Sequence, residues 1–67
     1  MINKKENANK LKQCRLEKDL TVEKVAKLLN VSQGSLWAWE SGRRTPRDDT
    51  KVMLAVFYGK DVDYLFY

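Results

Sequence analysis

The sequence predicts an all-α protein: a single compact bundle of five short helices within residues 1–67. Apolar residues recur at spacings of three and four, as on one face of a helix. Residues that commonly end helices, Asn30, Gly42 and Gly59, follow these apolar segments. The single cysteine, Cys14, excludes an internal disulfide, and no Cys/His cluster exists to bind zinc. In so short a chain the helices must therefore form the core by themselves.

The first helix is expected from about Glu6 to Lys18, preceded by a flexible N-terminal arm over about residues 1–5. One stripe of this helix, at spacings of three and four, carries Ala8, Leu11, Cys14, Arg15 and Lys18. Arg15 is unusual on such a stripe, because an arginine among core positions needs a partner.

A second helix from about Val22 to Leu29 and a third from Gln33 to Ser41 form a helix-turn-helix pattern over about residues 22–41. Thr21 and Ser32 precede these helices and can cap them with their hydroxyl groups. Asn30 suits a left-handed turn position between them. A turn this short forces two helices to cross steeply, and the small Ala26 fits where their backbones approach.

A fourth helix is expected after Pro46, with an acidic first turn and a bulky apolar segment that ends at Tyr58. Residues 52–58 alone could also form a strand, but the acidic start favours a helix. Asp61 can cap a last short helix, which holds Val62, Leu65 and Phe66.

The composition favours a binding protein over an enzyme. The net charge of +4, with a pI near 9.4, suggests an anionic partner. There is no histidine to activate a serine, no glycine-rich phosphate loop and no metal-ligand cluster. We therefore expect no enzymatic activity, no metal and no cofactor. No apolar segment is long enough to span a membrane and the N-terminus is no signal peptide, so we expect a cytoplasmic protein with a reduced thiol.

Three segments carry a resemblance to a known family: LKQCRLEKDLTVEKVAKLLNVS, SLWAWESGRRTP and LAVFYGKDVDYLF, within about residues 11–66. They resemble the phage Cro/repressor family of helix-turn-helix DNA-binding domains, the XRE type. The resemblance implies a lambda-repressor-like five-helix bundle whose third helix enters the major groove. It also implies that Arg15 forms a buried ion pair with Glu40, which would explain its place on the core stripe.

Base contacts are expected from the outward face of the third helix, which carries Gln33, Gly34, Trp37, Ala38 and Ser41. A glutamine amide can pair with adenine, although a solvated Gln33 is the alternative. Trp37 can touch a thymine methyl group, pack against backbone sugars, cover a partner chain or, half-buried, close the edge of the core. Gly34 can let the helix approach DNA closely or make room for Trp37.

Phosphate contacts are expected from the helix starts and the basic loop, namely from Val22, Ser32, Ser35, Arg43, Arg44 and Arg47. Val22 stands where many relatives have a phosphate-binding glutamine, so only its backbone amide could serve. The arginines could instead pair with Asp48 or Asp49. The lysines before residue 13 are expected to be solvated: Lys4, Lys5, Lys10 and Lys12.

These expectations describe a sequence-specific regulator of transcription that binds double-stranded DNA, a repressor acting as a homodimer on an inverted repeat. The aromatic C-terminal region, with Tyr64, Phe66 and Tyr67, is expected to form the dimer contact. The alternative is a protein-interaction module, such as an antitoxin or an inhibitor, with Trp37 as its anchor.

Overall fold

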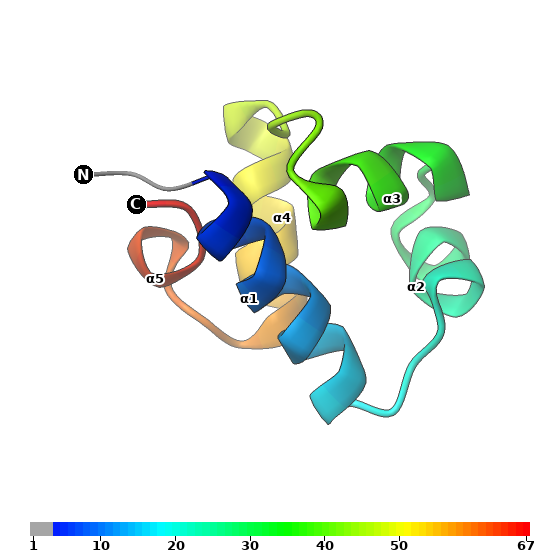
Figure 1. Cartoon of the computed structure of the whole chain (residues 1–67). Helices are drawn as coiled ribbons and strands as arrows, with labels where there is room; N and C mark the ends of the chain where they lie inside the picture. The colour runs from blue at the N-terminus through cyan, green and yellow to red at the C-terminus, as the bar shows by residue number, and fades with distance from the viewer. Residues whose placement is uncertain (1–3) are drawn as a thin grey trace.

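The computed structural model describes the backbone of residues 4–67 and the side chains of residues 9–67. Its helices are α1 (Lys4–Glu17), α2 (Val22–Leu29), α3 (Gln33–Ser41), α4 (Asp48–Tyr58) and α5 (Val62–Phe66). In Figure 1, α1 crosses in front of α4, with α5 on one side of it and the α2–α3 pair on the other. No strand occurs in the described chain, and residues 52–58 lie in α4, so the prediction of an all-α fold is confirmed.

The first helix differs from the prediction at both ends. It begins at Lys4 rather than Glu6 and ends at Glu17, one residue early. Two residues assigned to the flexible arm, Lys4 and Lys5, thus belong to α1, while residues 1–3 of that arm lie outside the described residues. The side chain of Ala8 also lies outside them.

The larger part of the core joins α1, α4 and α5. Its buried side chains are Leu11, Cys14, Leu54, Ala55, Tyr58, Leu65 and Phe66. Complete burial of a leucine side chain contributes about 1.5–3 kcal/mol, so these few residues account for much of the stability of a small domain. The predicted stripe on α1 is correct for Leu11 and Cys14 but not for Lys18, which is exposed.

A smaller core cluster lies between α2 and α3 and consists of Val25, Ala26 and Leu36. Trp39 is partly buried and packs against both clusters, as do Leu29 and Phe57. Trp39 therefore connects the helix-turn-helix to the rest of the bundle.

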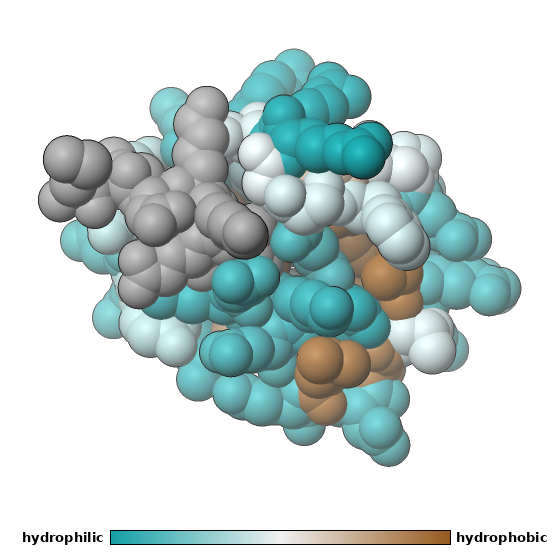
Figure 2. Space-filling model, in the orientation of Figure 1, coloured by the Kyte–Doolittle hydropathy of each residue, from teal (hydrophilic) through white to brown (hydrophobic). Residues whose placement is uncertain are grey.

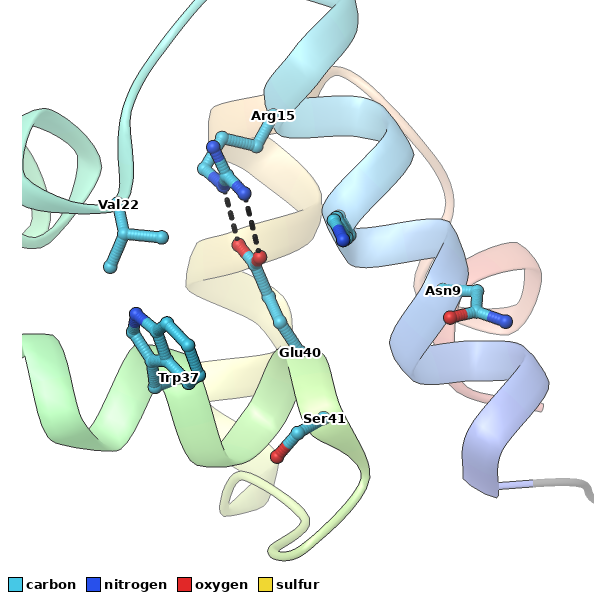
Figure 3. Close-up of a pocket in the computed structure, with 7 residues that line it drawn as sticks. Asn9, Arg15, Val22, Trp37, Glu40 and Ser41 are labelled. Carbon is cyan, nitrogen blue, oxygen red and sulfur yellow. Dashed lines mark hydrogen bonds and ion pairs between the residues drawn. The ribbon is translucent and has the colours of Figure 1, made fainter.

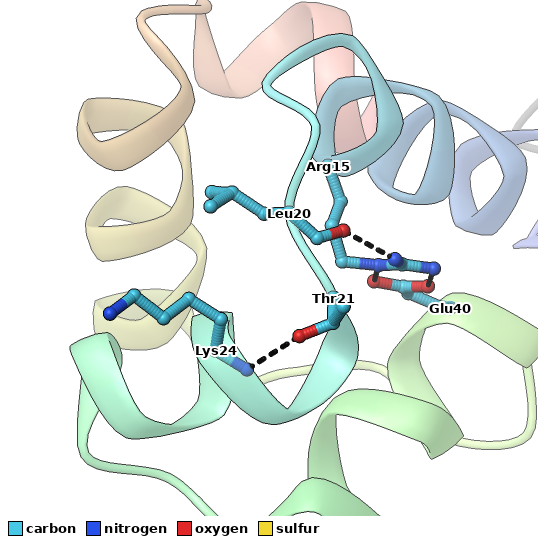
Figure 4. Close-up of polar contacts among 5 residues, drawn as sticks. All are labelled: Arg15, Leu20, Thr21, Lys24 and Glu40. Carbon is cyan, nitrogen blue, oxygen red and sulfur yellow. Dashed lines mark hydrogen bonds and ion pairs between the residues drawn. The ribbon is translucent and has the colours of Figure 1, made fainter.

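Local hydrogen bonds cap the starts of α2 and α3, and a left-handed residue forms the turn between these helices. The backbone N–H of Lys24 donates to Oγ1 of Thr21 at 3.1 Å (Figure 4), and that of Ser35 donates to Oγ of Ser32 at 3.0 Å. Asn30 is left-handed, with φ of 57°. Both predicted caps and the predicted turn residue are confirmed, because each depends only on near neighbours in the chain.

Two local features differ from the expectation. Asp61 stands at the N-cap of α5, but its side chain makes no capping hydrogen bond. Asp19 adopts a left-handed conformation, with φ of 58°, at the end of α1. Its short polar side chain tolerates this conformation better than most, although the sequence pattern had not pointed to it.

Candidate nucleic-acid interface

An ion pair between Arg15 and Glu40 joins α1 to α3. Nε of Arg15 donates to Oε2 of Glu40 at 2.8 Å, and a terminal guanidinium nitrogen donates to Oε1 at 3.1 Å. The other terminal nitrogen donates to the carbonyl oxygen of Leu20 at 2.8 Å (Figure 4). The two side chains are only 10% and 8% exposed. The hydrogen bond to Glu40 raises the pKa of Arg15, outweighing the opposing effect of burial.

The outward face of α3 is open to solvent. Gln33, Gly34, Trp37 and Ser41 are exposed, and Ala38 is half-buried. Trp37 is 65% exposed, so the alternative in which it is half-buried and closes the edge of the core is wrong. A Cβ atom added at Gly34 would meet no atom within 4 Å, so this glycine is not needed to make room for Trp37 either.

The basic loop that follows α3 is folded back onto the end of that helix. The backbone N–H groups of Arg43 and Arg44 donate to the carbonyl oxygen of Ala38 at 3.0 and 3.3 Å. Both arginine side chains are exposed, and neither forms an ion pair with a described side chain. Arg47 lies 3.9 Å from Asp49 (Nε to Oδ1), and at such exposure this pair contributes little.

The helix starts offer a few free backbone amides. The amide of Ser35 is occupied by Ser32, and the two hydroxyl groups of these serines are 2.8 Å apart. Val22, the first residue of α2, is half-buried and brings no polar side chain. The expected phosphate contacts at these positions thus depend on backbone N–H groups and on the serine hydroxyls.

A pocket of about 230 Å³ lies beside the outward face of α3, between that helix, α1 and the start of α2 (Figure 3). Its lining consists of Asn9, Lys12, Arg15, Val22, Trp37, Glu40 and Ser41. The sequence reasoning missed Asn9 and Lys12 as neighbours of Trp37. Asn9, Lys12 and Arg15 follow one another at spacings of three, which places them on one face of α1, and this was the available signal.

The C-terminal aromatic residues divide into buried and exposed ones. Tyr64 and Tyr67 are 49% and 56% exposed, but Phe66 is only 6% exposed and packs in the core, so its assignment to a dimer surface is wrong. Nζ of Lys10 donates to the carbonyl oxygen of Tyr64 at 3.0 Å, and Nζ of Lys51 to Oη of Tyr67 at the same distance. Lys10 was expected to be solvated, but it forms this hydrogen bond instead.

Neither a membrane-spanning helix nor a cluster of metal ligands is found among the described residues. No helix there combines the length and apolarity needed to cross a membrane. No group of three or more histidine, cysteine or acidic side chains in the described part of the chain is placed to hold a metal ion. Where Figure 2 shows described atoms, the surface is largely hydrophilic or pale, and apolar areas are small and separate.

Comparison with known proteins agrees with this architecture. The sequence model described as Helix-turn-helix matches residues 11–65. The chain is also 36% identical over 52 residues to the cryptic phage CTXphi transcriptional repressor RstR of Vibrio cholerae. This match covers 78% of the chain but 47% of the repressor, so the chain spans about half the length of that relative. The chain belongs to the helix-turn-helix family of the Cro/repressor (XRE) type.

Proposed function

We propose that the chain is a sequence-specific regulator of transcription that binds double-stranded DNA and represses as a homodimer on an inverted-repeat operator. The observation that carries the proposal is the open outward face of α3 next to two arginines that have no described partner. Family membership supports it, and the similar phage protein is itself a transcriptional repressor. A non-catalytic role in the cytoplasm, without metal or cofactor, goes with this proposal.

In the proposed complex α3 lies in the major groove. Gln33, at its exposed N-terminal end, pairs with a base edge, since helix-turn-helix proteins present their base-reading side chains there. Gly34, Ala38 and Ser41 border the same groove. Because nothing inside the chain requires a glycine at position 34, a close approach of DNA gives a reason for the missing side chain.

The basic loop fixes this helix against the duplex. Arg43 and Arg44 emerge where the loop folds back on α3, so their side chains can reach the phosphates that border the groove. Arg47 can exchange its weak contact with Asp49 for a phosphate. The backbone amides at Val22 and the serine groups of Ser32 and Ser35 are further phosphate contacts of the proposal.

The homodimer is proposed to form through the C-terminal region, with Tyr64 and Tyr67 as exposed contacts. Both rings already lie close to lysine ammonium groups, since Lys10 is 4.8 Å from the centroid of Tyr64 and Lys51 is 4.7 Å from that of Tyr67. These contacts restrict the rings before association, which reduces the entropy lost when a partner covers them.

The proposal is tested by selecting bound sequences from a random pool of double-stranded DNA. We expect one enriched inverted repeat, with affinity that falls by orders of magnitude between about 50 and 200 mM salt. Recovery of no preferred sequence would contradict it.

The same fold could instead present Trp37 to a protein, because an indole that is 65% exposed is a typical anchor of protein interfaces. An apolar contact of this kind would depend little on salt. A pool without enrichment, together with a salt-insensitive protein complex, would favour this second function.

A further inference from the structure

We propose that the pocket beside α3 binds one phosphate of the DNA backbone, held by the indole N–H of Trp37 and the ammonium group of Lys12. This inference rests on the proposed function and refines it, because it assigns Trp37 to the DNA backbone rather than to a base. It also makes α1, through Lys12, part of the DNA-binding surface.

The hydrogen-bonding groups of the pocket suit an anion. The indole nitrogen of Trp37 is a donor only, and no described residue accepts a hydrogen bond from it. Figure 3 shows this nitrogen on the edge of the ring that faces Val22, whose side chain cannot donate. The amide of Asn9 supplies a further donor on the α1 wall. A phosphate oxygen would satisfy these donors, whereas another donor would not.

The charges of the pocket also favour an anion. The lining contains two cations, Lys12 and Arg15, and one carboxylate, Glu40, so its net charge is +1. Arg15 is held by Glu40 at two points, which leaves Lys12 as the cation without a described acidic partner. An anion entering here therefore pairs with Lys12 without breaking the buried ion pair.

The position of the pocket matches the expected path of the duplex. Trp37 and Ser41 belong both to its lining and to the exposed face of α3, and Val22 opens α2. When a recognition helix lies in the major groove, the helix before it crosses the sugar-phosphate backbone. A volume of about 230 Å³ is several times that of a water molecule, which is enough for a phosphate group with its ester oxygens.

Trp37→Phe, Lys12→Gln and the charge-matched control Lys18→Gln test the inference. Trp37→Phe keeps an aromatic wall but removes the N–H, and should weaken binding roughly tenfold on the selected site and on scrambled DNA alike, at an unchanged salt slope. Lys12→Gln should lower the salt slope by about one per subunit, whereas Lys18→Gln, at an exposed position outside the pocket lining, should not. Thermal melts of the three variants should match wild type, because all three side chains are outside the core.

DNA in which single phosphates are replaced by uncharged methylphosphonates gives the decisive readout. A methylphosphonate at one position per half-site should weaken DNA binding by the wild-type protein. On DNA modified at that position, Trp37→Phe and Lys12→Gln should cause little additional loss of affinity. The inference would be overturned if the losses of affinity from the substitution and from the methylphosphonate added at every position, if Trp37→Phe changed the base preference, or if the variants bound with unchanged affinity. Each of these results would leave the proposed function standing. If the wild-type protein enriches no sequence from the pool, both this inference and the proposed function are contradicted.

Discussion

Arg15 and Glu40, which are 25 positions apart in the sequence, are joined by two hydrogen bonds of 2.8 and 3.1 Å. The pair connects α1 to the last part of α3, and the third hydrogen bond of Arg15 ties in the chain before α2 through the carbonyl of Leu20. One arginine thus links three parts of the fold. The same pair lines the pocket beside the exposed face of α3, so it also holds that face in place relative to α1.

Arg15→Ala should destabilise the protein by about 3–5 kcal/mol, because it leaves the carboxylate of Glu40 buried without a partner. This is a large part of the stability of a domain of this size. Urea denaturation followed by circular dichroism measures the change. Arg47→Ala is the control, since its pair is exposed and should contribute less than about 1 kcal/mol. Equal midpoints for the two variants would show that the buried pair does not stabilise the fold.

Thr21→Ala should destabilise the protein by about 0.5–2 kcal/mol, because the N–H of Lys24 loses the acceptor at the start of α2. Thr21→Ser keeps the hydroxyl and serves as the matched control. The free energy of unfolding is measured as above. If the alanine and serine variants were equally stable, the hydroxyl of Thr21 would not act as a cap.

Tyr58 should make stability fall in alkaline solution. Burial, and then the negative charge of Glu40, raise the pKa of Tyr58 from 10.0 to about 12. The folded protein therefore retains a proton that the unfolded chain has lost, so the contribution is full below about pH 10 and disappears as the pH rises through about 12. By about pH 11 the loss should be on the order of 1 kcal/mol.

Tyr58→Phe removes this titration and also the phenol oxygen, which has no hydrogen-bond partner in the described structure. The variant should be close to wild type at pH 7 and should lose less stability between pH 9 and 11. Burial also raises the pKa of Cys14, which acts in the same direction in both proteins, so the difference between them isolates Tyr58. Identical pH profiles would contradict the assignment.

Features that depend on near neighbours could be predicted from the residues themselves, whereas the Arg15–Glu40 pair between two helices was expected only through the family resemblance. The caps at Thr21 and Ser32 and the left-handed Asn30 each involve residues within a few positions. Helix α5 has only five residues, too few for periodicity to show that Phe66 faces the core while Tyr64 does not. The pocket forms where three elements meet: the spacing within α1 groups Lys12 with Arg15, but only the packing of α1 against α3 brings Lys12 into the same lining as Trp37.

The proposed dimer predicts two chains on each selected site, with half-site centres about one helical turn, ~34–36 Å, apart. Replacing Tyr64 and Tyr67 together with alanine should give a monomer that binds a single half-site weakly. The fold should persist, because about half of each ring is already exposed. Sedimentation of the DNA complexes counts the chains. A wild-type monomer on an unrepeated site would remove the dimer from the account.

Gln33→Ala and Arg44→Ala separate base reading from phosphate binding. Gln33→Ala removes a candidate base contact but no charge, so it should cost about 1–3 kcal/mol on the selected site and relax the preference at one base pair per half-site. Arg44→Ala should weaken binding to all sequences alike and lower the salt slope by about one per subunit. Both residues are exposed, so both variants should melt like wild type.

The most direct test of the account is the affinity of these two variants for the selected site and for scrambled DNA over a series of salt concentrations. The account predicts that Gln33→Ala loses discrimination at an unchanged salt slope, and that Arg44→Ala keeps discrimination at a reduced slope. If instead Arg44→Ala lost discrimination and Gln33→Ala reduced the salt slope, the roles of base reading and phosphate binding would be exchanged between the two residues. Unchanged binding in both variants would show that α3 does not face the DNA.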